Sequence, residues 1–395
     1  MMAALYYAMA DASSPQQVAT ALAAQLPLPQ LELLMLFCPP GDWLTDLARA
    51  LSVAFAQLRV VGCTSAGEFS PSGYSDQQVL AVGFDRQYFR IETALISSLG
   101  EFSFADAQRL VNDLQQRDQG RDDWPASFAF TLLDGLSSQE ERVLLTLETA
   151  LGHIPHFGGS AGDNNQLKRT HVLMQGQFRT DAAVVLFVRT SLPFQVFSTQ
   201  HLRAMQQKLV VTAASSDMRT LYELNAEPAA QAYADLLGLP IDALNSDVFA
   251  MHPLAVRMGQ DYYVRSIQRV NADGSLTFYC AVGVGAVLTE MQVQALLPDL
   301  EARLAAIAQE IGAIDWVLGC DCVLRRRELA LRDEFAAAQQ LFERYRFVGF
   351  NTYGEHLDGV HLNQTFTGVV FGKPAPVALG DATPAAHLVT SRELP

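Results

Sequence analysis

Residues 59–68 read Arg-Val-Val-Gly-Cys-Thr-Ser-Ala-Gly-Glu, and residues 346–355 read Arg-Phe-Val-Gly-Phe-Asn-Thr-Tyr-Gly-Glu. The first arginine, one valine, both glycines and the final glutamate match in register. A shorter third copy, Ser-Ala-Gly-Asp at residues 160–163, repeats Ser-Ala-Gly-Glu at residues 65–68. We therefore expect one structural unit to occur three times along the chain.

Each copy belongs to a longer repeated pattern, in which an apolar run and an amphipathic stretch precede the copy and another apolar run follows it. The first runs span residues 31–37, 128–133 and 314–320, the amphipathic stretches 43–58, 137–151 and 333–345, and the closing runs 79–84, 182–188 and 366–371. Short apolar runs are typical of buried strands, and amphipathic stretches of helices. The sequence thus predicts an α/β fold with mixed β-sheets flanked by helices and repeated strand–helix–strand units.

The region from residue 208 to residue 288 has a different pattern. Strand-like runs at 261–270 and 276–284 are joined by Asn-Ala-Asp-Gly-Ser at 271–275, which is a hairpin signal. A boundary near residues 205–220 follows. We predict two related halves, residues 1–215 and 216–375, and a tail rich in proline and alanine at 376–395.

An acidic residue closes each of the three repeated turns: Glu68, Asp163 and Glu355. One interpretation is that each acid accepts hydrogen bonds from the amides of its own turn. The other is that the three strand ends converge on one ligand, because ligand sites in open α/β sheets lie outside the carboxyl ends of strands. One turn could serve both purposes.

Composition excludes several classes of protein. Of the 395 residues, half are hydrophobic, and 27 Lys and Arg stand against 42 Asp and Glu, for a net charge of −15. Such a chain has material for a core, unlike a disordered protein, and lacks the basic surface of a nucleic-acid binder. No apolar run approaches the ~20 residues of a membrane span. Five scattered cysteines indicate reduced thiols, so we expect a cytoplasmic protein without nucleic-acid partners or membrane insertion.

The motifs also resemble a known family, the FIST proteins, a bacterial sensory module with an N-terminal and a C-terminal half. The resemblance extends from about residue 28 to about residue 373. It rests on residues 61–68, 157–163, Leu221-Tyr-Glu-Leu-Asn225 with Pro228, 252–254, 263–265, 353–355 and Asn363-Gln-Thr-Phe366. It implies a small-ligand sensory protein rather than an enzyme. The sequence agrees, since it has no phosphate-binding loop, nucleophile elbow or His-Glu-x-x-His motif.

Within that family the chain is most similar to the free-standing, haem-containing nitric-oxide sensors of the NosP type. Residues 352–355 followed by 361–368 carry this similarity. It implies a haem b cofactor and nitric oxide as the ligand. It further implies a partner in trans, either a histidine kinase or an enzyme of cyclic-di-GMP synthesis or degradation, and leaves a homodimer open.

A haem sensor needs an axial ligand, most often a neutral histidine. His361 is our first candidate for the metal ligand, followed by His356 and His252, because the first two lie where a strand end is expected. Arg257 and Arg265 are candidates for holding the haem propionates. The one basic cluster, residues 325–327, is interpreted as a solvated helix start. Ser137 lies three residues before Glu140, a capping-box signature.

The alternative is a FIST module that binds an amino acid or a similar metabolite without haem. Glu68, Asp163 and Glu355 would then hold an ammonium group, with Asn363 in the same pocket and an arginine on the carboxylate. A carboxylate-based enzyme would need these acids to approach one another closely.

Overall fold

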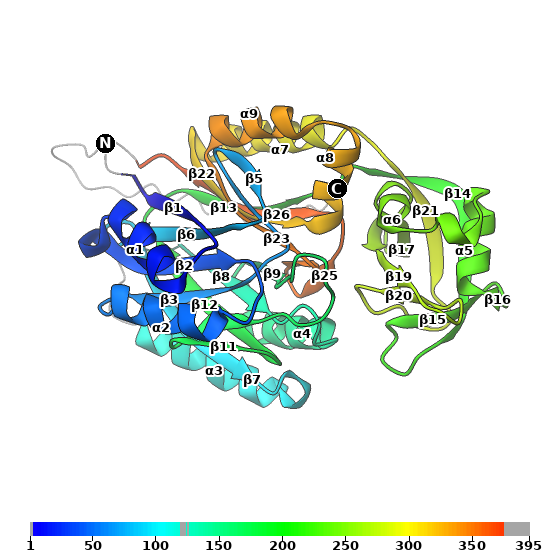
Figure 1. Cartoon of the computed structure of the whole chain (residues 1–395), viewed down its shortest axis with the longest axis horizontal. Coiled ribbons are helices and arrows are strands. Elements are labelled where there is room, and N and C mark those ends of the chain that lie inside the picture. The colour runs from blue at the N-terminus through cyan, green and yellow to red at the C-terminus, as the bar shows by residue number, and fades with distance from the viewer. Residues whose placement is uncertain (1–2, 119–123, 125, 375–395) are drawn as a thin grey trace.

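Three six-stranded sheets form the larger part of the protein, and a fourth sheet of eight strands forms a separate lobe (Figure 1). The structure is a computed structural model that describes residues 3–118, 124 and 126–374. The predicted tail at 376–395 therefore lies outside the described residues. Among the helices of the described part, none combines the length and the apolar character that a membrane crossing requires.

The first sheet contains the first repeated unit. Its strands run in the order β1 (Leu5–Asp11), β6 (Gln78–Asp85), β2 (Leu31–Cys38), β3 (Arg59–Thr64), β10 (Val172–Met174) and β11 (Gln177–Arg179). Only β2 and β3 are parallel, because helix α2 (Leu44–Ala54) returns the chain between them. Helices α1 (Pro15–Gln25) and α2 pack on the outer face of this sheet.

The other two sheets repeat this order. The second runs β7 (Phe89–Ser97), β12 (Ala182–Thr190), β8 (Ala126–Leu133), β9 (His156–Ser160), β24 (Glu355–Leu357) and β25 (Val360–Leu362), with helices α3 (Phe104–Arg117) and α4 (Glu140–Leu151). The third runs β13 (Phe194–Thr199), β26 (Phe366–Gly372), β22 (Ile314–Cys322), β23 (Phe347–Thr352), β4 (Glu68–Ser70) and β5 (Gly73–Ser75), with helices α7 (Leu296–Ile311), α8 (Val323–Leu331) and α9 (Phe335–Tyr345). Each sheet has one parallel pair, whose strands are connected by α2 in the first sheet, by α4 in the second and by α8 and α9 in the third.

The short hairpin after each repeated turn pairs with a different sheet. Hairpin β4–β5 follows the first copy and joins the third sheet, β10–β11 follows the second copy and joins the first sheet, and β24–β25 follows the third copy and joins the second. Every sheet is therefore completed by strands from another unit. The three units form one body, which we call the three-sheet body.

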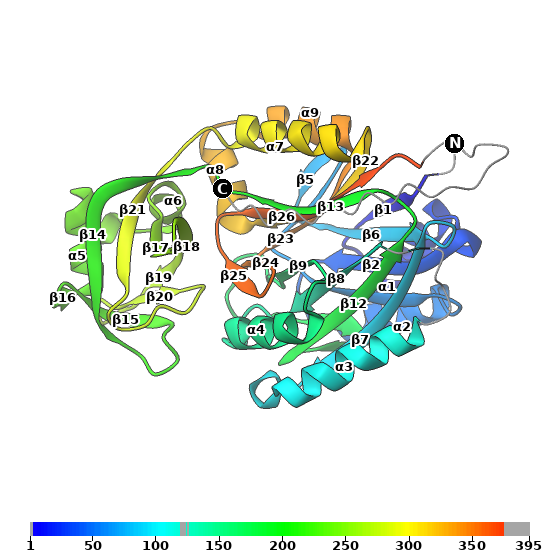
Figure 2. The same ribbon diagram turned by 180° about the vertical axis from the view of Figure 1, so that it is seen from behind.

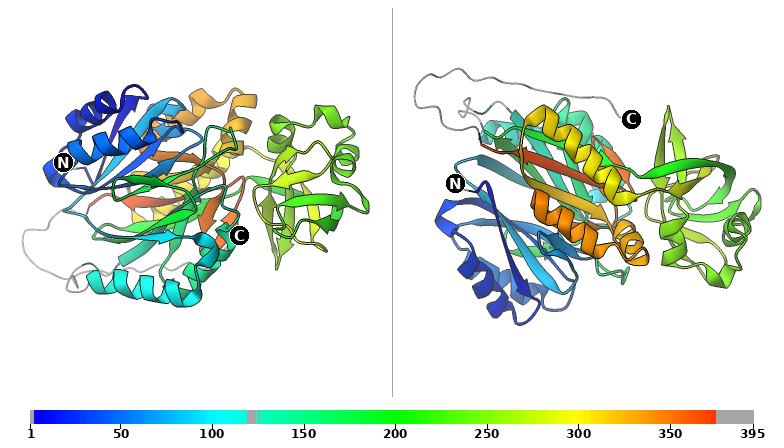
Figure 3. Two further views of the ribbon diagram at one scale, coloured as in Figure 1. Left: turned by 60° about the horizontal axis from the view of Figure 1, so that its bottom comes forward. Right: turned by 90° about the horizontal axis from the view of Figure 1, so that it is seen from above.

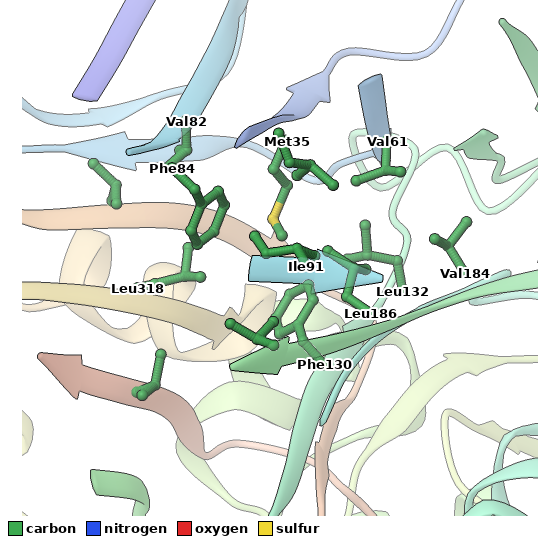
Figure 4. Close-up of a cluster of buried hydrophobic side chains, with 14 of the residues drawn as sticks. Met35, Val61, Val82, Phe84, Ile91, Phe130, Leu132, Val184, Leu186 and Leu318 are labelled. Carbon is green, nitrogen blue, oxygen red and sulfur yellow. The ribbon is translucent and has the colours of Figure 1, made fainter. Parts of the chain in front are cut away.

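A shared core fills the space between the inner faces of the three sheets (Figure 4). Met35 comes from the first sheet, Phe130 from the second and Leu318 from the third, and all three are buried. Helix pairs cover the outer faces, so the central strands are buried on both sides. Burial on both faces explains why these strands read as continuous apolar runs rather than alternating patterns.

Residues 202–293 form the eight-stranded sheet and are inserted into the third unit, between β13 and α7 (Figures 2 and 3). We call this segment the inserted lobe. Its order is β18 (Asp261–Arg265), β17 (Leu254–Met258), β21 (Val287–Val293), β14 (Leu202–Ala214), β15 (Thr220–Leu224), β20 (Leu276–Phe278) and β19 (Ile267–Val270), with β16 (Glu227–Pro228) beside β15 and helices α5 (Ala229–Leu237) and α6 (Ser246–Met251). The predicted turn at 271–275 joins β19 to β20.

The predicted α/β class, with mixed sheets flanked by helices and repeated strand–helix–strand units, is confirmed. The repetition is one of three units rather than of two halves, because the third unit begins with β13 and resumes at α7 after the inserted lobe. The predicted boundary at residue 215 stays a prediction, and β14, which ends at Ala214, already belongs to the lobe.

Candidate functional site

The three repeated turns contact one another at one end of the three-sheet body. The amide of Gly162 donates to the carbonyl of Thr64 at 3.0 Å, the amide of Ser160 to that of Gly354 at 2.8 Å, and the amide of Ala66 to that of Asn351 at 3.0 Å. The first turn thus bonds to the second and third, and the second bonds to the third. We call this closed set, residues 64–68, 160–163 and 351–355, the turn ring.

Two of the three predicted acids in the turn ring, Glu68 and Glu355, are fully buried. Glu68 accepts hydrogen bonds from the hydroxyls of Ser65 and Ser75. Glu355 accepts from the hydroxyl of Thr352 and, at 3.2 and 2.8 Å, from the amide and hydroxyl of Thr365. Their oxygens therefore have partners within the protein.

The third acid, Asp163, organises the loop that follows it. Its oxygens accept from the amides of residues 167, 168 and 169 at 2.7 to 2.9 Å and from the hydroxyl of Tyr353. Because Tyr353 belongs to the third turn, this bond also holds two turns together. Asp163 thus bonds the amides of its own loop, whereas Glu68 accepts only from hydroxyls and Glu355 from hydroxyls and the distant amide of Thr365.

Burial changes the charge that the ring acids carry. It raises the pKa of Glu68 to about 8 and the pKa of Glu355 to about 7. Glu68 is therefore mostly protonated at neutral pH, and Glu355 is protonated in part. A protonated carboxyl forms no ion pair with an ammonium group, which weakens the case for an amino-acid site at these two residues.

A second polar cluster lies where the inserted lobe meets the three-sheet body, and His361 is at its centre. The Nδ1 atom of His361, on β25, is 3.2 Å from Oε1 of Glu141 and 3.5 Å from Sγ of Cys280. Glu141 lies in the first turn of α4, and Cys280 follows β20 in the lobe. The Nε2 atom of the same ring is buried and has no hydrogen-bond partner.

Arg219 of the lobe completes this cluster. Its Nη2 donates to Oε2 of Glu140 and to Oε2 of Glu141, both at 2.7 Å. The amide of Ala281 donates to Oε1 of Glu141 at 2.8 Å. We call Glu140, Glu141, Arg219, Cys280 and His361 the seam cluster, since they tie the lobe to the body.

The charges of the seam cluster depend on one another. Burial alone would lower the pKa of His361, but Cys280 and Glu141 beside it raise that pKa to about 10. For Glu141 the effects have the opposite sign: burial alone would raise its pKa, but His361 and Arg219 hold that pKa well below its usual range. His361 is therefore an imidazolium at neutral pH, and it must release a proton before either ring nitrogen binds a metal.

The other two predicted histidines differ from His361. The ring nitrogens of His356 are bonded to Thr131 at 3.0 Å and to Ser160 at 2.9 Å, and burial lowers its pKa well below the usual value. His252 is exposed at the end of α6. Of the three, only His361 combines burial with an unpartnered ring nitrogen.

The predicted polar partners Arg265, Asn363 and Arg257 do not all lie near His361. Arg265 is buried and donates to the carbonyl of His361 at 3.4 Å, and Oδ1 of Asn363 accepts from the amide of Ser266 at 3.1 Å across the seam. Arg257 is exposed and bonds within its own hairpin, to Gly259 and Gln260. The structure thus brings Arg265 and Asn363 to His361, and leaves Arg257 in the solvent-exposed hairpin between β17 and β18.

Two local predictions fail in part or whole. The solvated helix start at 325–327 is wrong for Arg325, which is 1% exposed and bonds to Asp321 at 2.7 Å and to the ring of His201 at 3.1 Å, although Arg327 is exposed. The capping box is also absent, because the hydroxyl of Ser137 accepts from the amide of Gln139 and α4 has no side-chain cap bond. The carboxylate of Glu140 instead pairs with an arginine of the lobe.

Sequence reasoning did not place Glu141, Arg219 and Cys280 in the candidate site. Each comes from a different segment, and Glu141 is 220 residues from His361. Two signals were present in the sequence: a pair of acids at 140–141 where a helix was expected, and a cysteine within the strand-like run at 276–284. The burial of Glu140 became visible only in the structure.

The comparison with known families finds two matches. A FIST N domain matches residues 32–227, and a FIST C domain matches residues 229–358. No match was found among curated proteins. Together the two domains span more than four fifths of the chain, which therefore belongs to the FIST family of small-ligand sensory proteins.

Proposed function

We propose that this FIST protein is a haem-based nitric-oxide sensor, with His361 as the axial ligand. One observation carries the proposal: Nε2 of His361 is buried without a partner, while Nδ1 contacts the carboxylate of Glu141. Metal-binding histidines usually donate their other ring N–H to a carboxylate or carbonyl, which fixes the orientation of the ring. The similarity of residues 352–355 and 361–368 to NosP-type sensors is the reason for choosing haem.

The surrounding residues fit the group in chemistry. Arg265 and Arg219 supply cations beside His361 for propionates. An apolar cluster that includes Tyr279 of the lobe and Tyr353 of the body, with ring centroids 5.5 Å apart, lies at the same seam. Ferrous haem, when bound, supplies the iron that takes up nitric oxide.

Access to the ligand atom requires movement. A Cβ added to Gly354 would lie 1.9 Å from Nε2 of His361, so the backbone of Gly354 covers this nitrogen. The lobe or hairpin β24–β25 must therefore shift for His361 to reach a ligand. Because Cys280 and Arg219 belong to the lobe, such a shift changes their contacts with the body. This is how a local event at one histidine would bias the position of a whole lobe.

The signal would pass to a separate protein, which we propose to be a histidine kinase or an enzyme of cyclic-di-GMP synthesis or degradation. The net charge of −15 favours a partner with a basic surface.

The test is haem titration of the full-length protein, followed by its Soret absorption with and without nitric oxide. His361→Ala should lose haem or shift the Soret band. His252→Ala, which changes an exposed histidine, is the matched control and should bind haem like the wild type. A wild-type protein that stays colourless after haem titration would contradict the proposal.

The alternative is a FIST module that binds an amino acid or a similar metabolite without haem. The seam cluster and the neighbouring Arg265 favour it because they hold charges of both signs: Arg219 and Arg265 suit a carboxylate, and Glu141 suits an ammonium group. Mass spectrometry of the denatured protein would then show an amino acid retained through purification.

A further inference from the structure

Three potential metal ligands of the seam cluster converge from three separate segments. They are a carboxylate oxygen of Glu141, the thiol sulfur of Cys280 and a ring nitrogen of His361, and all lie within 4.8 Å of one another. Within the described residues, this is the one group of such side chains that could hold a metal ion. Cys280 and His361 are buried, and Glu141 is half-buried.

Two of the three separations match those around a tetrahedral ion, and the third lies within 4.8 Å. Zinc lies about 2.3 Å from a thiolate and about 2.0–2.1 Å from an imidazole or carboxylate ligand, so tetrahedral angles set sulfur and nitrogen ~3.5 Å apart and nitrogen and oxygen ~3.3 Å apart. The corresponding distances here are 3.5 Å between Sγ of Cys280 and Nδ1 of His361, and 3.2 Å between Nδ1 and Oε1 of Glu141. These two separations would therefore change little if an ion replaced the hydrogen-bonded proton.

We propose that Glu141, Cys280 and His361 form a binding site for a divalent transition-metal ion of the zinc type, which fastens the inserted lobe to the three-sheet body. The mixture of thiolate, imidazole and carboxylate suits a borderline ion such as Zn²⁺. Three protein ligands leave a fourth position open to water or to a small ligand.

The groups around this site orient its ligands. Arg219 holds Oε2 of Glu141 at 2.7 Å, which turns Oε1 toward His361. The amide of Ala281, next to the cysteine, donates to Oε1 of Glu141 at 2.8 Å. Such outer contacts commonly fix the geometry of metal ligands.

This ion would use Nδ1 of His361, whereas haem would use Nε2. The inference rests on the geometry of the three donors and does not depend on the proposed haem function. A variant that lacks only the thiol separates the two, since the haem proposal assigns no role to Cys280.

The test is titration of the metal-free, full-length protein with Co²⁺ as a spectroscopic probe and then with Zn²⁺. We expect one Co²⁺ per chain, a thiolate-to-cobalt charge-transfer band with the visible bands of a tetrahedral site, and displacement by Zn²⁺. Cys280→Ser should abolish the charge-transfer band. Cys38→Ser, which changes another buried cysteine in β2, should keep it.

Glu141→Gln provides a second test that preserves side-chain shape, should Cys280→Ser not fold. It should weaken Co²⁺ binding at least tenfold. Absence of Co²⁺ binding, a band that survives Cys280→Ser, or unchanged affinity in Glu141→Gln would overturn the metal site. Haem titration of Cys280→Ser keeps the two proposals apart, because this variant should lose the cobalt band but still bind haem. A wild-type protein that binds Co²⁺ but not haem contradicts the sensor proposal alone.

Discussion

Folding removes the carboxyl group of Glu68 completely from water. The free-energy cost of burying its ionised form should be visible in the pH dependence of stability. Its pKa rises from the ordinary value of 4.5 to about 8 in the folded protein. Between these values the folded chain holds a proton that the unfolded chain releases, so stability falls as pH rises through this window. One such proton corresponds to a loss of about 1.4 kcal/mol per pH unit.

Glu68→Gln removes this titration while keeping the shape of the side chain. We expect the free energy of unfolding of the variant to fall less steeply than that of the wild type between pH 5 and pH 8, measured by urea denaturation. Glu343→Gln, at an exposed position on α9, is the control and should keep the wild-type slope. Equal slopes for all three proteins would show that Glu68 is ionised in the fold.

The absence of a side chain at Gly354 leaves room for the imidazole ring of His361. An added Cβ would lie 1.9 Å from Nε2 of that ring, closer than non-bonded atoms approach. Gly354→Ala should therefore lower the free energy of unfolding by about 1–3 kcal/mol, the usual cost of overpacking. Gly100→Ala is the matched control, because a Cβ there meets nothing within 4 Å. Similar urea midpoints for both variants would contradict this explanation.

At the scale of elements, the start of α4 depends on the inserted lobe. Glu140 is buried, and its carboxylate pairs with Arg219, which is itself 7% exposed. Removing one partner of a buried ion pair leaves an uncompensated charge and typically costs about 3–5 kcal/mol. Arg219→Gln should therefore destabilise the protein strongly. The double variant Glu140→Gln/Arg219→Gln should regain part of the loss, measured as a double-mutant cycle by urea denaturation.

An exposed ion pair supplies the comparison. Arg109 and Asp106 on α3 lie one turn apart, with side chains 78% and 38% exposed. Water screens such a pair, so Arg109→Gln should leave the urea midpoint nearly unchanged. If Arg219→Gln were as mild as Arg109→Gln, the lobe would not anchor the start of α4.

The sequence predicted the elements better than their partners. The runs at 31–37, 128–133 and 314–320 became β2, β8 and β22, because strands buried on both faces must be apolar throughout. The pairing of each hairpin with the sheet of another unit could not be predicted from apolar runs, because the strands of β4–β5 and β10–β11 are only a few residues long. His361 was chosen from its place near a strand end, but Cys280 and Glu141, 81 and 220 residues away, could not be paired with it without the fold.

The whole molecule joins a body with one large shared core to a lobe held by polar contacts and one small apolar cluster. The body resists partial opening because each sheet is completed by strands of another unit. The lobe has its own core, and it contacts the body through hydrogen bonds such as those of Asn363 and Arg219 and through the small apolar cluster of Tyr279 and Tyr353. Regions with few buried apolar contacts open at lower free energy than the global transition. The seam should therefore open while the three sheets stay folded.

Asn363→Ala tests this difference by hydrogen exchange. The substitution removes the acceptor of the Ser266 amide, a buried donor, so exchange should accelerate in lobe peptides around residues 266 and 281. Peptides from β2, β8 and β22 should exchange as in the wild type. Asn271→Ala removes bonds within the β19–β20 hairpin instead, and should leave residue 281 unaffected. Equal acceleration throughout the three sheets would show that lobe and body open as one unit, and a ligand at the seam could then not shift the lobe alone.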